Sequence, residues 1–192
     1  PNKPIEQFGA DAVRYWAASA RLGLDATYDE GQMKIGRRLA IKLLNATKFA
    51  LAIGREDENH HVGEGATASW DPKDVTEPLD RAAMAKMAKV VYDATESLNN
   101  YEHSKALETI EDFFWQFCDD YIELVKNRAY GTAESTGVEP SPQAVKSART
   151  TLGLGLDAFA RLLAPFLPYT TEEVWSWMHA GEGSVHHAPW PK

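Results

Sequence analysis

The residues with the clearest chemical potential lie together on one predicted helix, which spans residues 30–53. An α-helix turns by about 100° per residue, so side chains within one arc share a face. Seven charged, amide or aromatic side chains of this helix fall within an arc of about 140°, and apolar residues that suit a protein core occupy the opposite arc. The outward residues are Lys34, Arg37, Arg38, Lys42, Asn45, Lys48 and Phe49.

This set of side chains suits single-stranded RNA. Lysine and arginine neutralise phosphates and release counterions. The amide of Asn45 can pair with a base edge, and the ring of Phe49 offers a stacking surface worth about 1–3 kcal/mol per base. The pattern therefore predicts an RNA-binding face. A simpler interpretation stays open, in which this is only a solvated helix face stabilised by acidic neighbours.

The bulk composition restricts the class of protein. The formal net charge is −8, whereas a dedicated nucleic-acid module is usually basic, so an RNA site must be a local basic face. Cys118 is the only cysteine and cannot form an internal disulfide, which fits a reducing cytosol. We find neither a membrane span nor a signal peptide, and therefore expect a cytoplasmic protein with no membrane partner. A first residue of Pro rather than Met suggests a piece of a longer chain.

Apolar residues recur at helical spacing along almost the whole chain. Isolated helices of this length are marginal in water, so their apolar stripes must bury against one another. We therefore predict an all-α fold, an antiparallel helical bundle, with a mobile surface loop over 55–77. The expected helices are two short ones within 4–20, the second capped by Asp11; then 30–53, 79–100, 102–130 and 143–164; and a short one that Thr170 or Thr171 caps and that ends near Met178.

Two groups of residues that resemble metal sites are interpreted structurally. Adjacent carboxylates on the predicted helix 102–130 are expected to be surface charges or to pair with cations three or four residues away. Two pairs of adjacent histidines lack a third ligand at the usual spacing. We therefore predict no metal site and no catalytic residue. The residues concerned are Asp119, Asp120 and Glu123 with Lys126 and Arg128, and the pairs His60–His61 and His186–His187.

Three small residues are assigned to packing. Cys118 lacks a neighbouring base and lies beside aromatic residues, so we place it in the core. Gly153 and Gly155 occupy a predicted helix at a cost of about 1 kcal/mol each relative to Ala. The expected compensation is a close approach of neighbouring helices.

Five segments, in order along the chain, resemble the anticodon-binding region of the valyl-tRNA synthetase family of class I aminoacyl-tRNA synthetases. The most specific segment is GQMKIGRRLAIKLLNATKFAL (31–51), which carries the family's Asn-Ala-small-basic-Phe core at residues 45–49. The helix segment at 106–126 departs in two respects: Phe114 stands where the family has Trp, with Trp115 following it, and Asp120 stands where an aromatic residue often follows the Cys-Asp pair. The other segments are FGADAVRYWAAS (8–19), ALETIEDFFWQFCDDYIELVK (106–126), LLAPFLPYTTEEVWSWM (162–178) and APWP (188–191).

The resemblance implies a helical bundle of the class I anticodon-binding type. Residues 1–29 would be linker helices after a catalytic core, 30–179 the bundle and 180–192 an extended tail. The bundle would bind the anticodon loop of tRNA(Val). Trp115, Asp119 and Lys126 complete the predicted RNA-binding set, with packing in the bundle as the alternative for Trp115. The full-length enzyme would be a monomer that attaches valine to tRNA using ATP and Mg²⁺. Its catalytic and coiled-coil domains would be partners of this chain, which would itself bind no cofactor.

Two alternatives stay open. Isoleucyl- and leucyl-tRNA synthetases share the bundle, although the Gly-x-Asp-x-x-Tyr-Asp segment at 23–29 favours the valyl enzyme. A helical scaffold that binds protein partners through its acidic faces is the alternative from another functional class.

Overall fold

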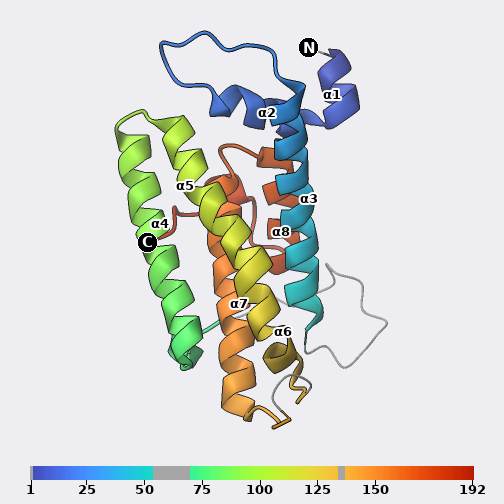
Figure 1. Ribbon diagram of the computed structural model, residues 1–192, viewed down its shortest axis with the longest axis vertical. Helices are drawn as coiled ribbons and strands as arrows, with labels where there is room; N and C mark the ends of the chain where they lie inside the picture. The colour runs from blue at the N-terminus through green and yellow to red at the C-terminus, as the bar shows by residue number, and fades with distance from the viewer. Residues whose placement is uncertain (1, 54–69, 134–136) are drawn as a thin grey trace.

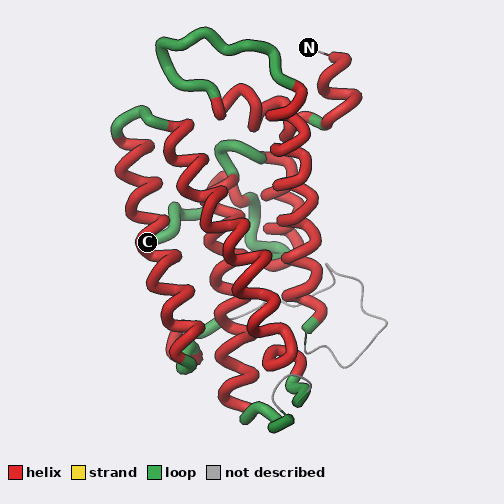
Figure 2. Tube along the Cα trace, in the orientation of Figure 1, coloured by secondary structure: helices red, strands yellow, loops and turns green. Residues whose placement is uncertain are grey.

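The computed structural model describes residues 2–53, 70–133 and 137–192, and every regular element within these ranges is helical (Figures 1 and 2). The predicted all-α fold is therefore confirmed. His60, His61 and most of the predicted loop 55–77 lie outside the described residues. In chain order the elements are α1 (Asn2–Phe8), α2 (Ala10–Ser19), α3 (Glu30–Ala52), η1 (Pro72–Asp74), α4 (Pro78–Asn99), α5 (His103–Gln116), η2 (Phe117–Tyr121), α6 (Ile122–Tyr130), α7 (Pro142–Leu163), α8 (Pro168–Met178) and η3 (Val185–His187).

Four long helical columns run along the molecule and alternate in direction: α3, α4, α5 continued by α6, and α7 (Figure 1). The helix α7 lies at the centre, in contact with α3, α4, α5, α6 and α8. The short helices α1 and α2 lie at the end of the bundle where α3 begins, and α2 packs against α3, α5 and α8. In the described ranges no helix is both long and apolar enough to cross a membrane.

Local sequence determines where several helices begin and end. The carboxylate of Asp29 accepts hydrogen bonds from the backbone N–H groups of Gly31 (2.7 Å) and Gln32 (3.2 Å), which caps α3. Ser141 caps α7 in the same way. Proline occupies the first turn of α4, α7 and α8, where a missing N–H costs nothing. Gly131, with φ of +79°, ends α6 in the left-handed conformation.

The predicted caps of α2 and α8 are both wrong, because the carboxylate predicted to cap α2 binds the start of α8 instead. Asp11 does not cap its own helix α2, which begins without a side-chain cap. Its carboxylate instead accepts hydrogen bonds from the backbone N–H groups of Tyr169 and Thr170 and from the Thr170 hydroxyl, at 2.5–3.2 Å. A carboxylate stabilises a helix N-terminus, here that of α8. Since α8 begins at Pro168, neither Thr170 nor Thr171 caps it.

The predicted single helix 102–130 is interrupted in its middle. The segment η2 between α5 and α6 is one turn of π-helix, which changes the direction of the side chains that follow it. Within this turn Tyr121 is buried and Asp119 is exposed. Cys118 is buried as predicted, and burial raises the pKa of its thiol to about 12.

Aromatic rings fill the centre of the bundle around Phe159. The space beside the two glycines of α7 is occupied by aromatic rings. The prediction that these glycines allow a close approach of neighbouring helix backbones is therefore wrong. A Cβ at Gly155 would lie 2.5 Å from Cζ of Phe117, and one at Gly153 would overlap the ring of Trp70. Trp70, the first described residue after the gap, therefore packs against α7 at Gly153. The rings within 5.1–5.7 Å of Phe159 are Phe113, Phe114 and Phe117.

The tail, predicted as extended, contains the single turn η3 and is bound to the bundle at several points. The indole N–H of Trp190 donates to Oγ1 of Thr95 on α4 at 2.9 Å. The carboxylate of Glu172 on α8 accepts hydrogen bonds from the Ser184 hydroxyl and the Val185 N–H. These bonds fasten the tail across α4 and α8.

A buried carboxylate joins four elements of the bundle. Asp80 at the start of α4 is fully buried and accepts hydrogen bonds from Tyr121 (2.7 Å), Arg128 (2.6 and 2.7 Å) and Ser147 (2.5 Å). The predicted pairing of Arg128 with its near neighbours in sequence is therefore wrong. Burial alone would raise the pKa of Asp80, but the hydrogen bonds from Arg128, Ser147 and Tyr121 together outweigh burial and lower it.

We expect Asp80→Ala to reduce the free energy of unfolding by about 3–5 kcal/mol, because it leaves the Arg128 charge without its partner inside the protein. Urea unfolding measures this change. The control is Asp93→Ala on the same helix, which removes only the exposed ion pair with Lys89 and should cost less than about 1 kcal/mol. Equal effects of the two substitutions would contradict the structural role of Asp80.

The same carboxylate should contribute to acid unfolding. Because the folded-state pKa of Asp80 is lowered, its contribution to stability is complete above the unfolded-state pKa of about 3.9 and is lost as the pH falls through the folded-state value. Between pH 5 and pH 2, the free energy of unfolding should therefore fall more steeply in the wild type than in Asp80→Asn. Parallel curves for the two proteins would rule out this contribution.

Candidate nucleic-acid interface

The outward orientation of the predicted RNA-binding face follows from how α3 packs. Met33, Leu39 and Leu43 are completely buried on its inner side. Gly36 lies where α2 crosses, and a Cβ at this position would lie 2.5 Å from Cβ of Tyr15. This close crossing and the buried apolar residues fix the rotation of α3, so the opposite arc is turned toward solvent.

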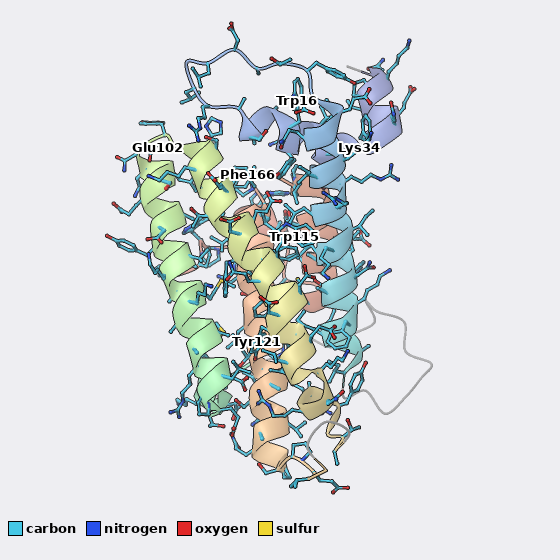
Figure 3. The ribbon with its side chains drawn as sticks, in the orientation of Figure 1. Trp16, Lys34, Glu102, Trp115, Tyr121 and Phe166 are labelled. Atoms are coloured by element: carbon cyan, nitrogen blue, oxygen red, sulfur yellow. The ribbon has the colours of Figure 1, made fainter. Side chains whose placement is uncertain are left out.

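Three of the predicted residues form an open row along the centre of that arc. Lys34, Arg38 and Asn45 are exposed, and no hydrogen bond or ion pair joins them to any described residue. Lys34 lies toward the upper end of α3 in Figure 3. These three residues, named the open row below, present two cations and one amide to solvent.

On the side of α5 and α6, the open row is bordered by an ion pair. Nζ of Lys42 lies 2.6 Å from Oδ1 of Asp119 in η2, and both side chains keep contact with solvent, with 36% and 56% of their surface exposed. The hydrogen bond that Lys42 donates to Asp119 is the main reason that the pKa of Lys42 is raised. The structure thus brings together two predicted site residues from different helices.

Further along the same border, Phe49 is half-buried and packs against the core. Its ring meets that of Tyr130, the last residue of α6, at a centroid distance of 5.9 Å and an interplanar angle of 81°. Lys126 lies one turn before Tyr130 and forms an ion pair with Glu123 at 2.5 Å, as predicted for helix neighbours.

The opposite border of the open row faces α1 and α8. The guanidinium of Arg37 donates to the backbone carbonyl of Gln7 at 3.0 Å. The ammonium of Lys48 lies 5.2 Å from the centre of the Trp177 ring on α8, a cation–π contact. Both cations are exposed but are held by neighbouring elements, unlike Lys34 and Arg38.

Trp115 is the predicted site residue that fits RNA contact least well. Its ring is half-buried against the core, and its indole N–H donates to Glu111 at 3.0 Å. The same carboxylate accepts a hydrogen bond of 2.5 Å from the hydroxyl of Tyr15. Trp115 therefore takes part in the packing of α5 against α2.

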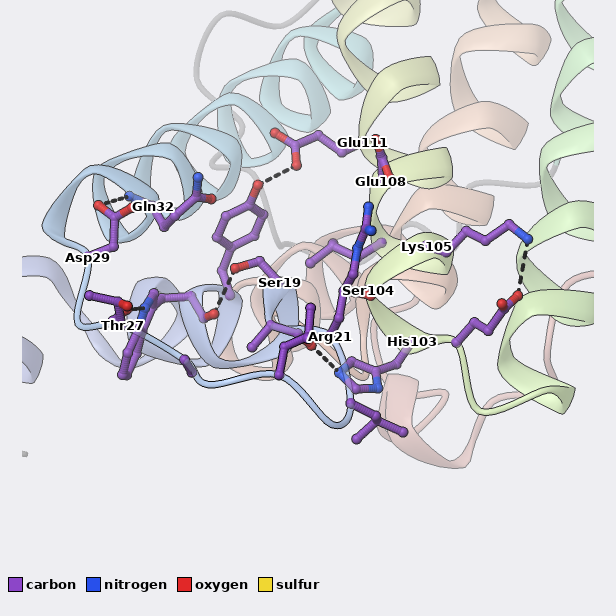
Figure 4. Close-up of a pocket in the computed structure, with 18 of the residues that line it drawn as sticks. Ser19, Arg21, Thr27, Asp29, Gln32, His103, Ser104, Lys105, Glu108 and Glu111 are labelled. Atoms are coloured by element: carbon purple, nitrogen blue, oxygen red, sulfur yellow. Dashed lines mark hydrogen bonds and ion pairs between the residues drawn. The ribbon is translucent and has the colours of Figure 1, made fainter.

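A large cavity lies beyond the N-terminal end of α3. It has a volume of about 1060 Å³, is open to solvent, and is lined by α2, the loop 20–29 and the start of α5 (Figure 4). Within the lining, Nε2 of His103 donates a hydrogen bond to the Ala20 carbonyl, and the Glu111 carboxylate accepts one from the Tyr15 hydroxyl. The RNA-binding residues predicted on α3 do not line this cavity.

The histidines and carboxylates of the described ranges do not gather into a metal site. No group of three or more His, Cys, Asp or Glu side chains is arranged there to hold an ion. His186 instead contacts the carbonyl of Pro168 through Nε2 at 3.2 Å.

Two aromatic residues beside the open row are absent from the sequence-based RNA-binding set. Tyr130 is 53% exposed, and Trp177 lies beneath Lys48. A sequence signal exists for Tyr130, because it follows Lys126 by four residues and must share its helix face. The contact of Trp177 with Lys48 joins residues far apart in sequence, so helical spacing gives no sign of it.

Comparison with known proteins assigns the fold to a family. The family described as "Anticodon-binding domain of tRNA ligase" matches residues 80–192, which is more than half of the chain. The match begins in α4 and does not include α3. The structure also resembles that of Agrobacterium radiobacter K84 LeuRS in a ternary complex with tRNA and LeuAMS, with a TM-score of 0.69 and 20% sequence identity. That similarity covers all of this chain and 20% of the other.

Sequence relatives extend the similarity over the whole chain. Valine–tRNA ligase of Bifidobacterium longum is 82% identical over 191 residues, and that of Thermobifida fusca is 53% identical over 191 residues. The alignments cover all of this chain but 21% and 19% of these two proteins, so the chain spans about a fifth of their length. The chain belongs to the anticodon-binding domain family of tRNA ligases, and along its full length it resembles the corresponding region of valine–tRNA ligases.

Proposed function

We propose that this chain binds the anticodon loop of tRNA(Val) as one region of a valine–tRNA ligase. The observation that carries the proposal is the open row of α3. Lys34 and Arg38 are exposed cations without a partner among the described residues, and Asn45 lies on the same face. A loop of RNA supplies phosphates for the cations and unpaired base edges for the amide.

The borders of the open row support the same proposal. The ammonium of Lys42 can leave the exposed carboxylate of Asp119 for a phosphate, because a surface ion pair contributes only about 0–1 kcal/mol. Lys48 remains exposed beside Trp177, and the half-buried ring of Phe49 borders the row next to Tyr130. Trp115 and Lys126, which the resemblance also suggests, lie on the neighbouring column and are secondary candidates.

The wider role follows from the relatives. The full-length protein would join valine to tRNA(Val) with ATP and Mg²⁺ bound outside this chain, and would act in the cytoplasm as a monomer. Residues 1–29 would connect a catalytic domain to the bundle of 30–179, and the tail of 180–192 would lead toward a coiled-coil domain. Identity of 82% to a valine–tRNA ligase favours valine over leucine or isoleucine, since the LeuRS similarity concerns the fold alone.

The open row should contribute directly to tRNA affinity. In the full-length protein, the double substitution Lys34→Gln and Arg38→Gln should weaken tRNA(Val) binding by about tenfold to a hundredfold, because two charged phosphate contacts are lost. The slope of log affinity against log salt concentration should become shallower by roughly 1.5. Filter binding or fluorescence anisotropy at several salt concentrations measures both quantities.

The matched control removes two positive charges from surface positions outside α3. Lys89 on α4 and Lys146 on α7 are exposed lysines outside α3, and their double substitution to Gln should leave the affinity within about twofold. A protein scaffold without RNA function would give the same affinity for both double variants and the wild type, and that result would end the proposal.

The choice of amino acid is tested by aminoacylation. The full-length protein with ATP and Mg²⁺ should charge tRNA(Val) with valine, and should not charge leucine or isoleucine tRNA with their amino acids. Charging of isoleucine tRNA alone would refute the assignment to valine while leaving the RNA-binding face of α3 intact.

A further inference from the structure

One exposed aromatic residue beside the open row has a geometry that suits a nucleobase. The rings of Phe49 and Tyr130 meet nearly at right angles, at a centroid distance of 5.9 Å. In such a pair the edge of one ring points at the face of the other, so each ring keeps at least one face that its partner does not cover. Burial decides which ring can receive a base, because only a solvent-exposed face is accessible.

The exposed ring is that of Tyr130. Phe49 is half-buried and packs against the hydrophobic core, whereas 53% of the Tyr130 surface is open to solvent. The backbone also holds Tyr130 in place, since Ala129 before it is completely buried and Gly131 after it ends the helix with φ of +79°. The outer aromatic surface at this border therefore belongs mainly to Tyr130.

Polar groups stand next to this pair of rings on both helices. Asn45 precedes Phe49 by four residues on α3, and Lys126 precedes Tyr130 by four residues on α6. Residues with this spacing are neighbours on a helix face, about 5–6 Å apart at Cβ. A base stacked on Tyr130 would thus have the ammonium of Lys126 about one helical turn away as a partner for a phosphate. The amide of Asn45, one turn from the adjoining ring of Phe49, would be a partner for a base edge.

We infer that Tyr130 is a base-stacking residue of this surface, on which an unpaired nucleobase of the bound RNA loop rests. The inference rests on the proposed function and adds a residue to it. The occupant is a base rather than an apolar protein side chain, because the open row beside it carries the positive charge that attracts a phosphate backbone. Phe49 then acts as a positioning residue that supports the Tyr130 ring from below.

Substitutions of Tyr130 in the full-length protein test the inference. Tyr130→Ala and Tyr130→Leu should each weaken tRNA(Val) binding about tenfold, because neither offers a ring for stacking. Tyr130→Phe should stay within about twofold of the wild type. The control Tyr92→Ala, at an exposed tyrosine of α4 with 65% of its surface open, should leave the affinity unchanged.

A spectroscopic measurement separates stacking from a merely structural role. In tRNA(Val) transcripts carrying 2-aminopurine at one anticodon-loop position at a time, at least one position should lose fluorescence on binding the wild type and Tyr130→Phe. The same position should keep its fluorescence when saturated with Tyr130→Leu, whose thermal unfolding midpoint serves as a check of the fold.

The outcomes are distinguishable from failure of the proposed function. If Tyr130→Leu binds tRNA and quenches 2-aminopurine as the wild type does, while the Lys34 and Arg38 double variant still loses affinity, the stacking role is wrong and the RNA-binding face stands. If the wild type itself does not bind tRNA(Val), the proposed function fails and this inference fails with it.

Discussion

The arrangement of this bundle depends on the carboxylate of Asp80. A fully buried charge is tolerated only when its hydrogen-bonding capacity is met, and here Tyr121, Arg128 and Ser147 meet it. These partners belong to η2, α6 and α7, so the start of α4 cannot be placed correctly without the other three elements. The network therefore fixes the position of α6 against the rest of the bundle.

The same network is connected to the proposed RNA-binding surface by short stretches of chain. Asp119 and Tyr121 are two residues apart in η2, yet one extends outward to Lys42 and the other inward to Asp80. Likewise Arg128 binds Asp80 from the inside, and Tyr130, two residues later, is exposed next to Phe49. The buried charge thus determines where two surface residues of α6 and η2 stand relative to α3.

Helical spacing predicts the local part of this structure and misses the long-range part. The face of Lys34, Arg38 and Asn45 follows from the sequence because it needs only the 100° rotation per residue and the burial of the opposite side. The pairing of Asp80 with Arg128 does not follow, because residues 48 positions apart meet only after the chain has folded.

Two further errors have the same origin. The local rule for helix caps assigns Asp11 to α2, but the tertiary fold places its carboxylate at the start of α8, 158 and 159 residues away. The π-turn at η2 is also invisible to apolar periodicity, since the residues on either side of it keep helical spacing. A sequence-based interpretation therefore identifies the basic face but not the neighbours that border it.

These neighbours explain how an acidic chain can keep a basic surface available. The chain carries a net charge of −8, which on average disfavours RNA, whereas residues Lys34–Ile53 include no acidic side chain. The acidic residue that does approach, Asp119, binds the ammonium of Lys42 at the border and leaves the centre of the row free. Because that pair is solvent-exposed, exchanging the carboxylate for a phosphate costs little. Under the proposed function, repulsion by the acidic surface would favour the approach of an RNA loop to α3, where its phosphates meet the cations of the open row.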